Sequence, residues 1–249
     1  MAEEESQNNL PGVADDAASA PAREKAKPHY HGHRQRLRER FMATGGEGMP
    51  DYELLELVLS IAIPRSDVKP LAKDLLQQFK SFNGVITADP KALGRVKGMG
   101  EVSAAALKVV QAAAVRLARG EIMDKPLISS WDRLLDYCMA AMGHEKVEQT
   151  RVLFLDKRNR LIADERQNKG TVDHTPLYPR EVVKRALELG ATAIILVHNH
   201  PSGDPTPSRA DIDVTKEVQD AAAKLGIALH DHLIISREGP ASFKSLGLL

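Results

Sequence analysis

Two histidines, His198 and His200, stand one residue apart in the C-terminal part of the sequence, and Asp211 follows eleven residues after the second. Imidazole nitrogens and a carboxylate oxygen form a ligand set that suits Zn²⁺. Three protein ligands leave one position of a tetrahedral zinc ion open for water, which is the arrangement of catalytic sites. Zinc lowers the pKa of such a water toward neutrality and makes it a nucleophile. The three residues therefore predict one catalytic zinc ion per chain.

The elements on either side would position these ligands. The apolar run at 191–197 is long enough for one buried strand, and Ser208 begins a helical pattern as its cap. The Pro- and Gly-rich stretch between them allows the chain to bend as it leaves the strand. We expect the ligands at a strand end and in the first turn of a helix, where sites of α/β sheets usually form. Ser208 would supply a hydrogen-bond donor for an oxyanion.

Composition and charge narrow the class of protein. The chain has 249 residues, no formal net charge and 43% hydrophobic residues, enough for one or two packed domains. Residues 23–120 carry 17 basic and 10 acidic side chains, so a nucleic-acid partner would be sought there. The sequence has no apolar run of membrane-spanning length and a start unlike a signal peptide. Its single cysteine, Cys138, lies on an apolar helix face and indicates packing. We expect a cytoplasmic protein with no membrane partner.

The pattern along the chain divides it into four parts. Residues 1–27 are acidic, without periodicity, and predict a disordered tail. Residues 28–120 predict a small all-α domain, 121–128 a linker, and 129–249 an α/β domain in which strands and helices alternate.

The all-α part contains a turn, Gly98-Met99-Gly100, between two helical patterns. It resembles a helix-hairpin-helix motif, in which glycines let a DNA phosphate approach the amides at a helix N-terminus. Lys97, with Arg95 and Lys108 nearby, would add contacts that give affinity without sequence choice. The alternative is a helical hairpin that packs only on its own neighbours.

The stretch His198-Asn-His-Pro-Ser-Gly-Asp-Pro-Thr-Pro-Ser-Arg-Ala-Asp211 looks like the JAMM motif of the JAB1/MPN metalloprotease fold. The wider run from Pro179 to Asp211, the basic run at 32–41 and the Gly-Met-Gly turn are similar to the bacterial RadC family. The resemblance covers roughly residues 29–249. It implies a cytidine-deaminase-like α/β domain of MPN type after a helix-hairpin-helix domain.

The resemblance also implies roles for individual residues. His198, His200 and Asp211 would bind zinc, and Ser208 would steady the tetrahedral intermediate. An upstream glutamate would act as general base and acid. We expect this to be Glu165, on the second strand of the α/β domain; the competitor, Glu181, is explained by the dipole of the helix it begins.

The other histidines are predicted to be bystanders. His31 and His33 lie in a basic helix start without a third ligand at usable spacing. His230 and His232 are alternate residues of one strand, so they should face the same side. They could support the metal ligands from behind, but we expect core or edge histidines. His174 follows in a polar loop and could border a substrate groove. The contiguous letters His-Asn-His do not indicate an HNH nuclease, whose motif residues are spread more widely.

Two functions compete at this point. The first is a zinc metallohydrolase that cleaves a peptide or isopeptide amide in an unidentified peptide or protein substrate. The second is a DNA-binding accessory factor in repair or recombination that uses the basic helix-hairpin-helix domain.

Overall fold

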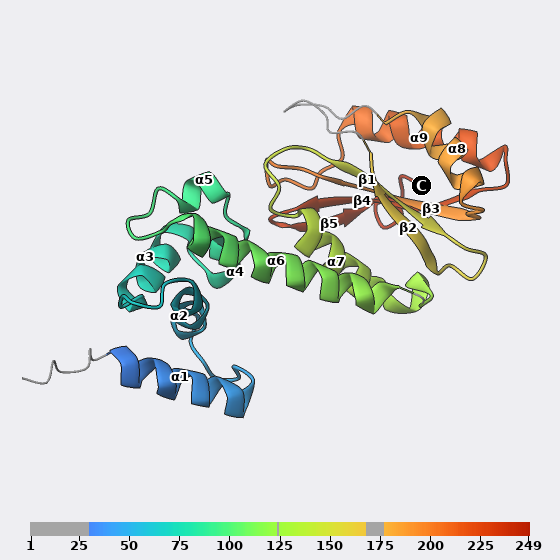
Figure 1. The fold of residues 1–249 in the computed structure, drawn as a ribbon. Helices are drawn as coiled ribbons and strands as arrows, with labels where there is room; N and C mark the ends of the chain where they lie inside the picture. Colours follow the sequence, from blue (N-terminus) through green and yellow to red (C-terminus); the bar gives the residue numbers. More distant parts are fainter. Residues whose placement is uncertain (1–29, 124, 168–176) are drawn as a thin grey trace, which may run out of the picture.

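The computed structural model describes residues 30–123, 125–167 and 177–249. The predicted acidic tail at 1–27 and His174 lie outside the described residues. The described chain forms a helical lobe and an α/β lobe, joined by the long helix α6 (Figure 1).

Within the described residues the helical lobe contains six helices. Their bounds are α1 Tyr30–Thr44, α2 Asp51–Ala62, α3 Lys69–Phe79, α4 Phe82–Thr87, α5 Pro90–Leu93 and α6 Glu101–Ile122. Short polar side chains begin the two smallest: Ser81 Oγ accepts from Gly84 N at 2.9 Å, and Asp89 Oδ1 accepts from Lys91 N at 2.8 Å. Apolar residues at helical spacing from α2 to α6 form one core, which includes Leu55, Leu59, Leu75, Val85, Leu93 and Leu107.

The α/β lobe is built on a sheet of five strands in the order β2-β1-β3-β4-β5. Its elements are a 3-10 turn η1 Leu127–Ser130, α7 Trp131–Met142, β1 Thr150–Leu155, β2 Leu161–Arg166, α8 Pro179–Glu188, β3 Ala193–Asn199, α9 Arg209–Ala223, β4 Ala228–Ser236 and β5 Gly239–Ser242. Among the described strands only β3 and β4 pair in parallel. The helix α9 forms the crossover between them, as a parallel pair requires.

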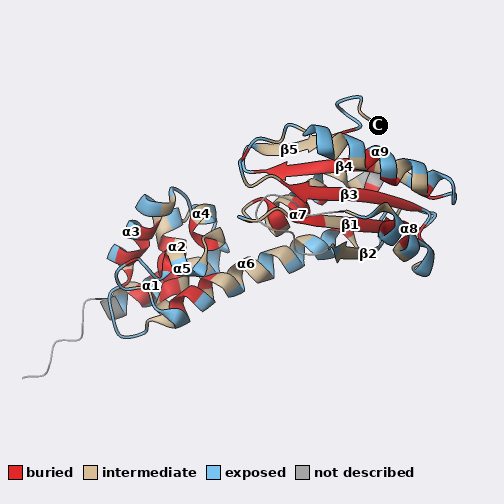
Figure 2. Cartoon of the chain, turned by 90° about the horizontal axis from the view of Figure 1, so that it is seen from above, coloured by how far each residue is buried: buried red, intermediate tan, exposed pale blue. Residues whose placement is uncertain are grey.

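Helices cover both faces of this sheet, with α7 on one side and α8 and α9 on the other (Figures 1 and 2). Successive side chains of a strand point to opposite faces. Leu153, Ile195 and Val197 therefore pack toward α7, whereas Val152 and Leu196 pack toward α8 and α9. All seven residues of β3 are buried, because this strand lies at the centre of the sheet.

Part of the segment predicted as a linker, 121–128, packs into the core of the α/β lobe. Helix α6 continues to Ile122, and Ile122 and Leu127 are both buried in the core beneath α7. Met123 and Pro126 form isolated bridges to Leu161 and Arg160. The α/β lobe thus takes part of its core from the end of the helix that leaves the helical lobe.

The architecture confirms the predicted class, a helical region followed by a mixed α/β domain. None of the described helices combines the length and the apolar character needed to cross a bilayer.

Candidate metal centre

Strand β3 and helix α9 bring His198, His200 and Asp211 together. His198 is buried near the end of β3, His200 follows the strand, and Asp211 lies in the first turn of α9. His198 Nε2 lies 2.9 Å from His200 Nε2 and 3.4 Å from Asp211 Oδ1, and His200 Nε2 lies 3.5 Å from Asp211 Oδ2. The three residues each direct one potential ligand atom into a space where all these atoms lie within 4.8 Å.

The hydrogen bonds of the two imidazoles fit a cation at this point. His200 Nδ1 lies 2.8 Å from the carbonyl oxygen of Asp204, which can only accept, so Nδ1 carries the proton. In the neutral ring of His200, Nε2 then carries a lone pair that is directed at Asp211. A tetrahedral zinc site has ligand atoms roughly 3.4 Å apart, close to the two nitrogen–oxygen distances. The two Nε2 atoms would need to separate by roughly half an ångström. The donor set therefore fits zinc.

Electrostatics favour an ionised carboxylate beside neutral and protonatable imidazoles. Burial opposes ionisation of Asp211, but the hydrogen bonds that its carboxylate accepts from His200, when that ring is protonated, and from Ser208 outweigh burial and lower the Asp211 pKa. Burial lowers the pKa of His198 to about 4. The hydrogen bond to Asp211 raises the pKa of His200, against its burial. The imidazole of His198 is thus held neutral, the form that binds metal.

Behind His198 lies a chain of buried polar groups. His198 Nδ1 is 2.8 Å from His232 Nε2, and His232 Nδ1 is 2.6 Å from Thr215 Oγ1, which in turn donates to the backbone oxygen of Asp211. His232 also stacks on Phe243. With a proton on each Nδ1 atom, His198 donates to His232 Nε2 and His232 donates to Thr215 Oγ1. The lone pair of His198 Nε2 is then directed at the site. Partners of this kind fix the orientation of metal-binding histidines.

The prediction that His230 and His232 face the same side was wrong. The register of β3 against β4 shifts between Ile194 and Ile195, which is a β-bulge that adds a residue to β4. His232 consequently faces His198 and α9, whereas His230 bonds Asn159 Oδ1 at 2.6 Å. His232 belongs to the site, and the sequence reasoning that made it a bystander did not foresee the bulge.

Ser208 holds Asp211 in place. Its backbone N and its Oγ lie 2.8 and 2.6 Å from Asp211 Oδ2, and Asp211 N lies 3.2 Å from Ser208 Oγ. This is a capping box, which satisfies backbone groups at the start of α9 and at the same time orients the carboxylate. In this arrangement the hydroxyl proton of Ser208 is engaged by Asp211.

The structure does not bring Glu165 to the cluster. Glu165 lies on β2, two strands from β3 and so roughly 10 Å to the side of it. Its carboxylate forms a two-pronged ion pair with Arg185 of α8, at 2.7 to 3.0 Å. Glu181 is exposed at the start of α8 and pairs with Arg180. Neither glutamate belongs to the group of His198, His200 and Asp211, and the expectation that Glu165 acts there needs correction.

A different glutamate, Glu148, lies beside the site. The pairs Thr150 with His198 and Gln149 with Asn199 continue the β1–β3 register outward, which puts Glu148 opposite His200. Alternation places Glu148 on the same face as Thr150 and His198. Glu148 is half-buried, and after Asp211 and Asp204 its charge contributes to the raised pKa of His200. Sequence reasoning missed Glu148 because the signal lies in strand pairing: Glu148 stands two residues before the start of β1.

The residues predicted to contact DNA lie in the helical lobe. Lys97, Gly98 and Gly100 are exposed between α5 and α6, and Gly98 has a φ of 94° that favours glycine. The amide of Gly100 donates to Ser103 Oγ at 2.8 Å.

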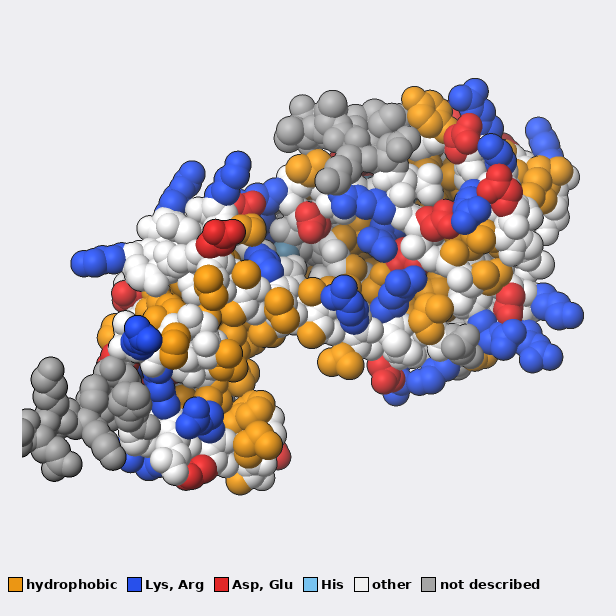
Figure 3. Space-filling view, viewed as in Figure 1, with side chains coloured by type: hydrophobic (Ala, Val, Ile, Leu, Met, Phe, Trp, Pro, Cys, Tyr) orange, Lys and Arg blue, Asp and Glu red, His pale blue; other side chains and the backbone are white. Residues whose placement is uncertain are grey.

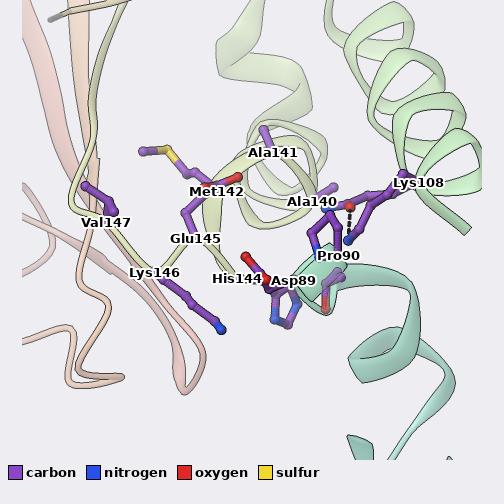
Figure 4. A pocket seen from close by; sticks show the side chains of 12 residues that line it. Asp89, Pro90, Lys108, Ala140, Ala141, Met142, His144, Glu145, Lys146 and Val147 are labelled. Atoms are coloured by element: carbon purple, nitrogen blue, oxygen red, sulfur yellow. Dashed lines mark hydrogen bonds between the residues drawn. The ribbon is translucent and has the colours of Figure 1, made fainter. Parts of the chain in front are cut away.

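Lys108 does not join this turn. It donates to Ile86 O and Gln111 Oε1 beside a cavity of about 330 Å³ between the lobes (Figure 4). Its contribution to phosphate binding stays a prediction. Cys138 is buried in the core beneath α7, and burial raises its pKa, so it is a packing residue.

Comparison with known proteins covers both lobes. Residues 128–248 match the model of the RadC-like JAB domain, and residues 31–105 match the UPF0758 N-terminal model. A UPF0758 protein of Rhodobacter capsulatus is 61% identical over 213 residues, which span 86% of this chain and all of that protein. A UPF0758 protein of Ruegeria pomeroyi is 58% identical over 217 residues, 87% of this chain and 97% of the relative. The α/β lobe with its His-His-Asp cluster is thus a JAB-type (MPN) domain, and the chain belongs to the RadC family of UPF0758 proteins.

Proposed function

We propose that this protein is a zinc-dependent hydrolase that cleaves a peptide or isopeptide amide. The observation that carries the proposal is the convergence of His198 Nε2, His200 Nε2 and the Asp211 carboxylate on one point. Bound there, zinc would supply a Lewis acid that polarises a carbonyl group and activates water. A JAB-type domain agrees with this chemistry.

The acid–base role in this proposal goes to Glu148 instead of Glu165. A general base must come within hydrogen-bond reach of the proton that it removes. Glu148 stands opposite His200 on the ligand face, whereas the carboxylate of Glu165 is occupied by Arg185. Glu148 would accept a proton from the attacking water and deliver it to the leaving amine, so that the amide bond breaks with no net change in the protein.

The main role of Ser208 in this proposal would be to orient the metal ligand Asp211. Its hydroxyl keeps Asp211 directed at the two histidines. Donation from Ser208 to a developing oxyanion, the role expected from the JAMM resemblance, would require the hydroxyl to turn from Asp211 to the substrate.

The test uses the full-length protein on a cell extract, because the substrate is unidentified. Zinc-loaded wild type, Glu148→Gln and Glu165→Gln proteins are incubated with the extract, and newly formed α-amino groups and lysine side-chain amines are quantified by mass spectrometry. We expect Glu148→Gln to keep zinc but lose at least about 100-fold of the cleavage, the scale of general acid–base catalysis. Glu165→Gln is the matched control, and should keep most of it.

Three outcomes would contradict the proposal. They are absence of new amines with the zinc-loaded wild type, cleavage that persists after the metal is removed by a chelator, and cleavage that Glu148→Gln leaves intact. Loss of cleavage in Glu165→Gln alone would return the base to Glu165.

A second candidate function is DNA binding by the helical lobe. Arg95 and Lys97 are exposed beside the Gly98 turn, and Lys and Arg side chains project from the edge of the lobe near α5 (Figure 3). Backbone amides at a helix start with adjacent cations suit a phosphate group. Duplex affinity that falls steeply with salt and drops about tenfold in Lys97→Ala would support this function. Affinity unchanged in Lys97→Ala and Gly98→Ala would exclude this turn as the contact.

A further inference from the structure

The residue between the two histidines, Asn199, is buried and fully bonded. It is 1% exposed and ends β3. Its Oδ1 lies 2.9 Å from the amide N of Gln149, and its Nδ2 lies 3.2 and 3.4 Å from the carbonyl oxygens of Val147 and Glu145. Its own backbone N bonds Gln149 O at 3.3 Å. One side chain thus takes up three backbone groups of the segment 145–149.

These bonds require an amide side chain. The Gln149 N–H can only donate, and the two carbonyl groups can only accept, so the orientation of the Asn199 amide follows from its partners. An aspartate at this position would keep an acceptor for Gln149 but would direct its second oxygen at two carbonyl oxygens. An alanine would leave all three backbone groups without these partners.

The segment that Asn199 holds carries Glu148. A regular strand would continue the β1–β3 ladder through backbone bonds, but here the side chain of Asn199 replaces the backbone acceptor for Gln149 N. The segment can thereby turn away from the sheet beyond Gln149, with Glu148 directly beside the last pair of the β1–β3 ladder. On its other side, Glu145 and Lys146 line the cavity between the lobes (Figure 4), and His144 lies 3.4 Å from Asn83 of α4.

We propose that Asn199 is a positioning residue that fixes the Glu148-bearing segment 145–149 against the metal-binding end of β3. The role deepens the proposed hydrolase function and rests on it. The same short stretch of β3 then determines two distances at once, since His198 and His200 hold the metal and the residue between them sets how far Glu148 lies from it. Asn199 itself contacts neither the metal ligand atoms nor a reacting group.

A purely structural role for Asn199 makes a different prediction. In that case its loss would lower stability, without any specific link between Asn199 and Glu148. A positioning role predicts that the effects of changing Asn199 and Glu148 on the metal site are coupled, because each change removes the same carboxylate from its place.

The experiment uses the full chain with cobalt in place of zinc and needs no substrate. The visible absorption of the cobalt protein is titrated with pH for wild type, Asn199→Asp, Asn199→Ala, Glu148→Gln and the Asn199→Ala/Glu148→Gln double variant. We expect Glu148→Gln to shift the midpoint of the titration, and both Asn199 variants to shift it in the same direction. The double variant should show no further shift beyond Glu148→Gln.

Two further measurements distinguish a role of Asn199 in positioning Glu148 from a role in the stability of the fold. Hydrogen exchange of the Gln149 amide should speed up by at least about tenfold in Asn199→Ala, the scale of one or two lost hydrogen bonds. Cobalt affinity should fall by less than the roughly tenfold loss expected when a direct support of the ligands is removed. Gln149→Ala is the matched control, because it removes the side-chain bond to Glu145 and keeps the backbone groups that Asn199 binds.

The outcomes keep the two proposals apart. The proposed function is overturned if the wild-type protein binds no cobalt at the site, or if Glu148→Gln leaves the pH midpoint of the cobalt absorption unchanged. A titration that responds to Glu148→Gln but not to Asn199→Asp or Asn199→Ala overturns the role of Asn199. Additive shifts in the double variant also overturn it. Should Asn199→Ala not fold, Asn199→Asp carries the same comparison.

Discussion

Two of the His-x-His pairs in the sequence, His31/His33 and His198/His200, have different roles in the fold. His31 and His33 lie in α1, where successive residues turn by about 100° and residues two apart face nearly opposite directions. His198 and His200 lie at the end of β3, and their Nε2 atoms are 2.9 Å apart. On a helix this spacing puts two residues on nearly opposite sides, whereas at the end of β3 it brings two imidazoles together.

The partners of each pair extend the contrast. His33 Nε2 lies 2.9 Å from Glu56 Oε1, a buried carboxylate of α2, and so joins two helices. His198 and His200 share Asp211, which arrives from a helix behind a nine-residue loop, and have His232 and Thr215 behind them. Whether a His-x-His pair can bind a metal therefore depends as much on the strands and helices that meet at it as on the residue types.

The largest predicted effect removes one ligand. His198→Ala should lower zinc affinity by more than about 100-fold, because a ligand of a protein zinc site contributes on the order of 3 kcal/mol. His33→Ala should leave zinc affinity unchanged. Competition with a chromophoric chelator on the full-length variants gives both values. Similar losses in the two variants, or zinc bound equally well by wild type and His198→Ala, would remove the distinction between the pairs.

Much of this arrangement could be predicted from the sequence. The apolar run before His198, the Ser208 cap and the Pro- and Gly-rich stretch between them gave the strand, the helix start and the bend, because local patterns determine all three. The same reasoning predicted the helical region and the α/β domain.

The failures involve long-range pairing. Glu165 was preferred over Glu181, and Glu148 was not considered, because a position on a strand does not show which strand lies beside it. The order β2-β1-β3 puts Glu165 too far from the cluster. His230 and His232 were expected to face the same side of the sheet. The bulge opposite Ile194 and Ile195 puts them on opposite sides, so that only His232 faces His198. Each depends on register, which a single sequence does not contain.

The second prediction concerns that bulge. His232→Ala should lower zinc affinity by about 10- to 100-fold, the usual cost of losing a hydrogen-bond partner of a metal-binding histidine. His230→Ala, only two residues away on the same strand, should change it by less than about twofold, because His230 faces the other side and bonds Asn159. Chelator competition again gives the values. Equal effects would mean that His232 acts through the packing of β4 and not through His198.

The last prediction concerns His33 and Glu56 in the helical lobe and the free energy of unfolding alone. Glu56 is 1% exposed, and its Oε2 has no hydrogen-bond partner within the described part of the chain. Glu56 Oε1 lies 2.9 Å from His33 Nε2, but the two atoms are not aligned for a hydrogen bond. His33→Ala should therefore cost about 1–3 kcal/mol of unfolding free energy, the penalty for a buried polar group left without its partner.

Urea unfolding of the metal-free protein, followed by circular dichroism, measures this cost. Adding Glu56→Gln to His33→Ala should recover part of the stability, because the double variant no longer buries an unpaired charge. A double variant that is less stable than His33→Ala alone would show that the Glu56 carboxylate has another source of stabilisation. In that case His33 would be an ordinary helix residue, and the contrast between the two pairs would rest on the metal site alone.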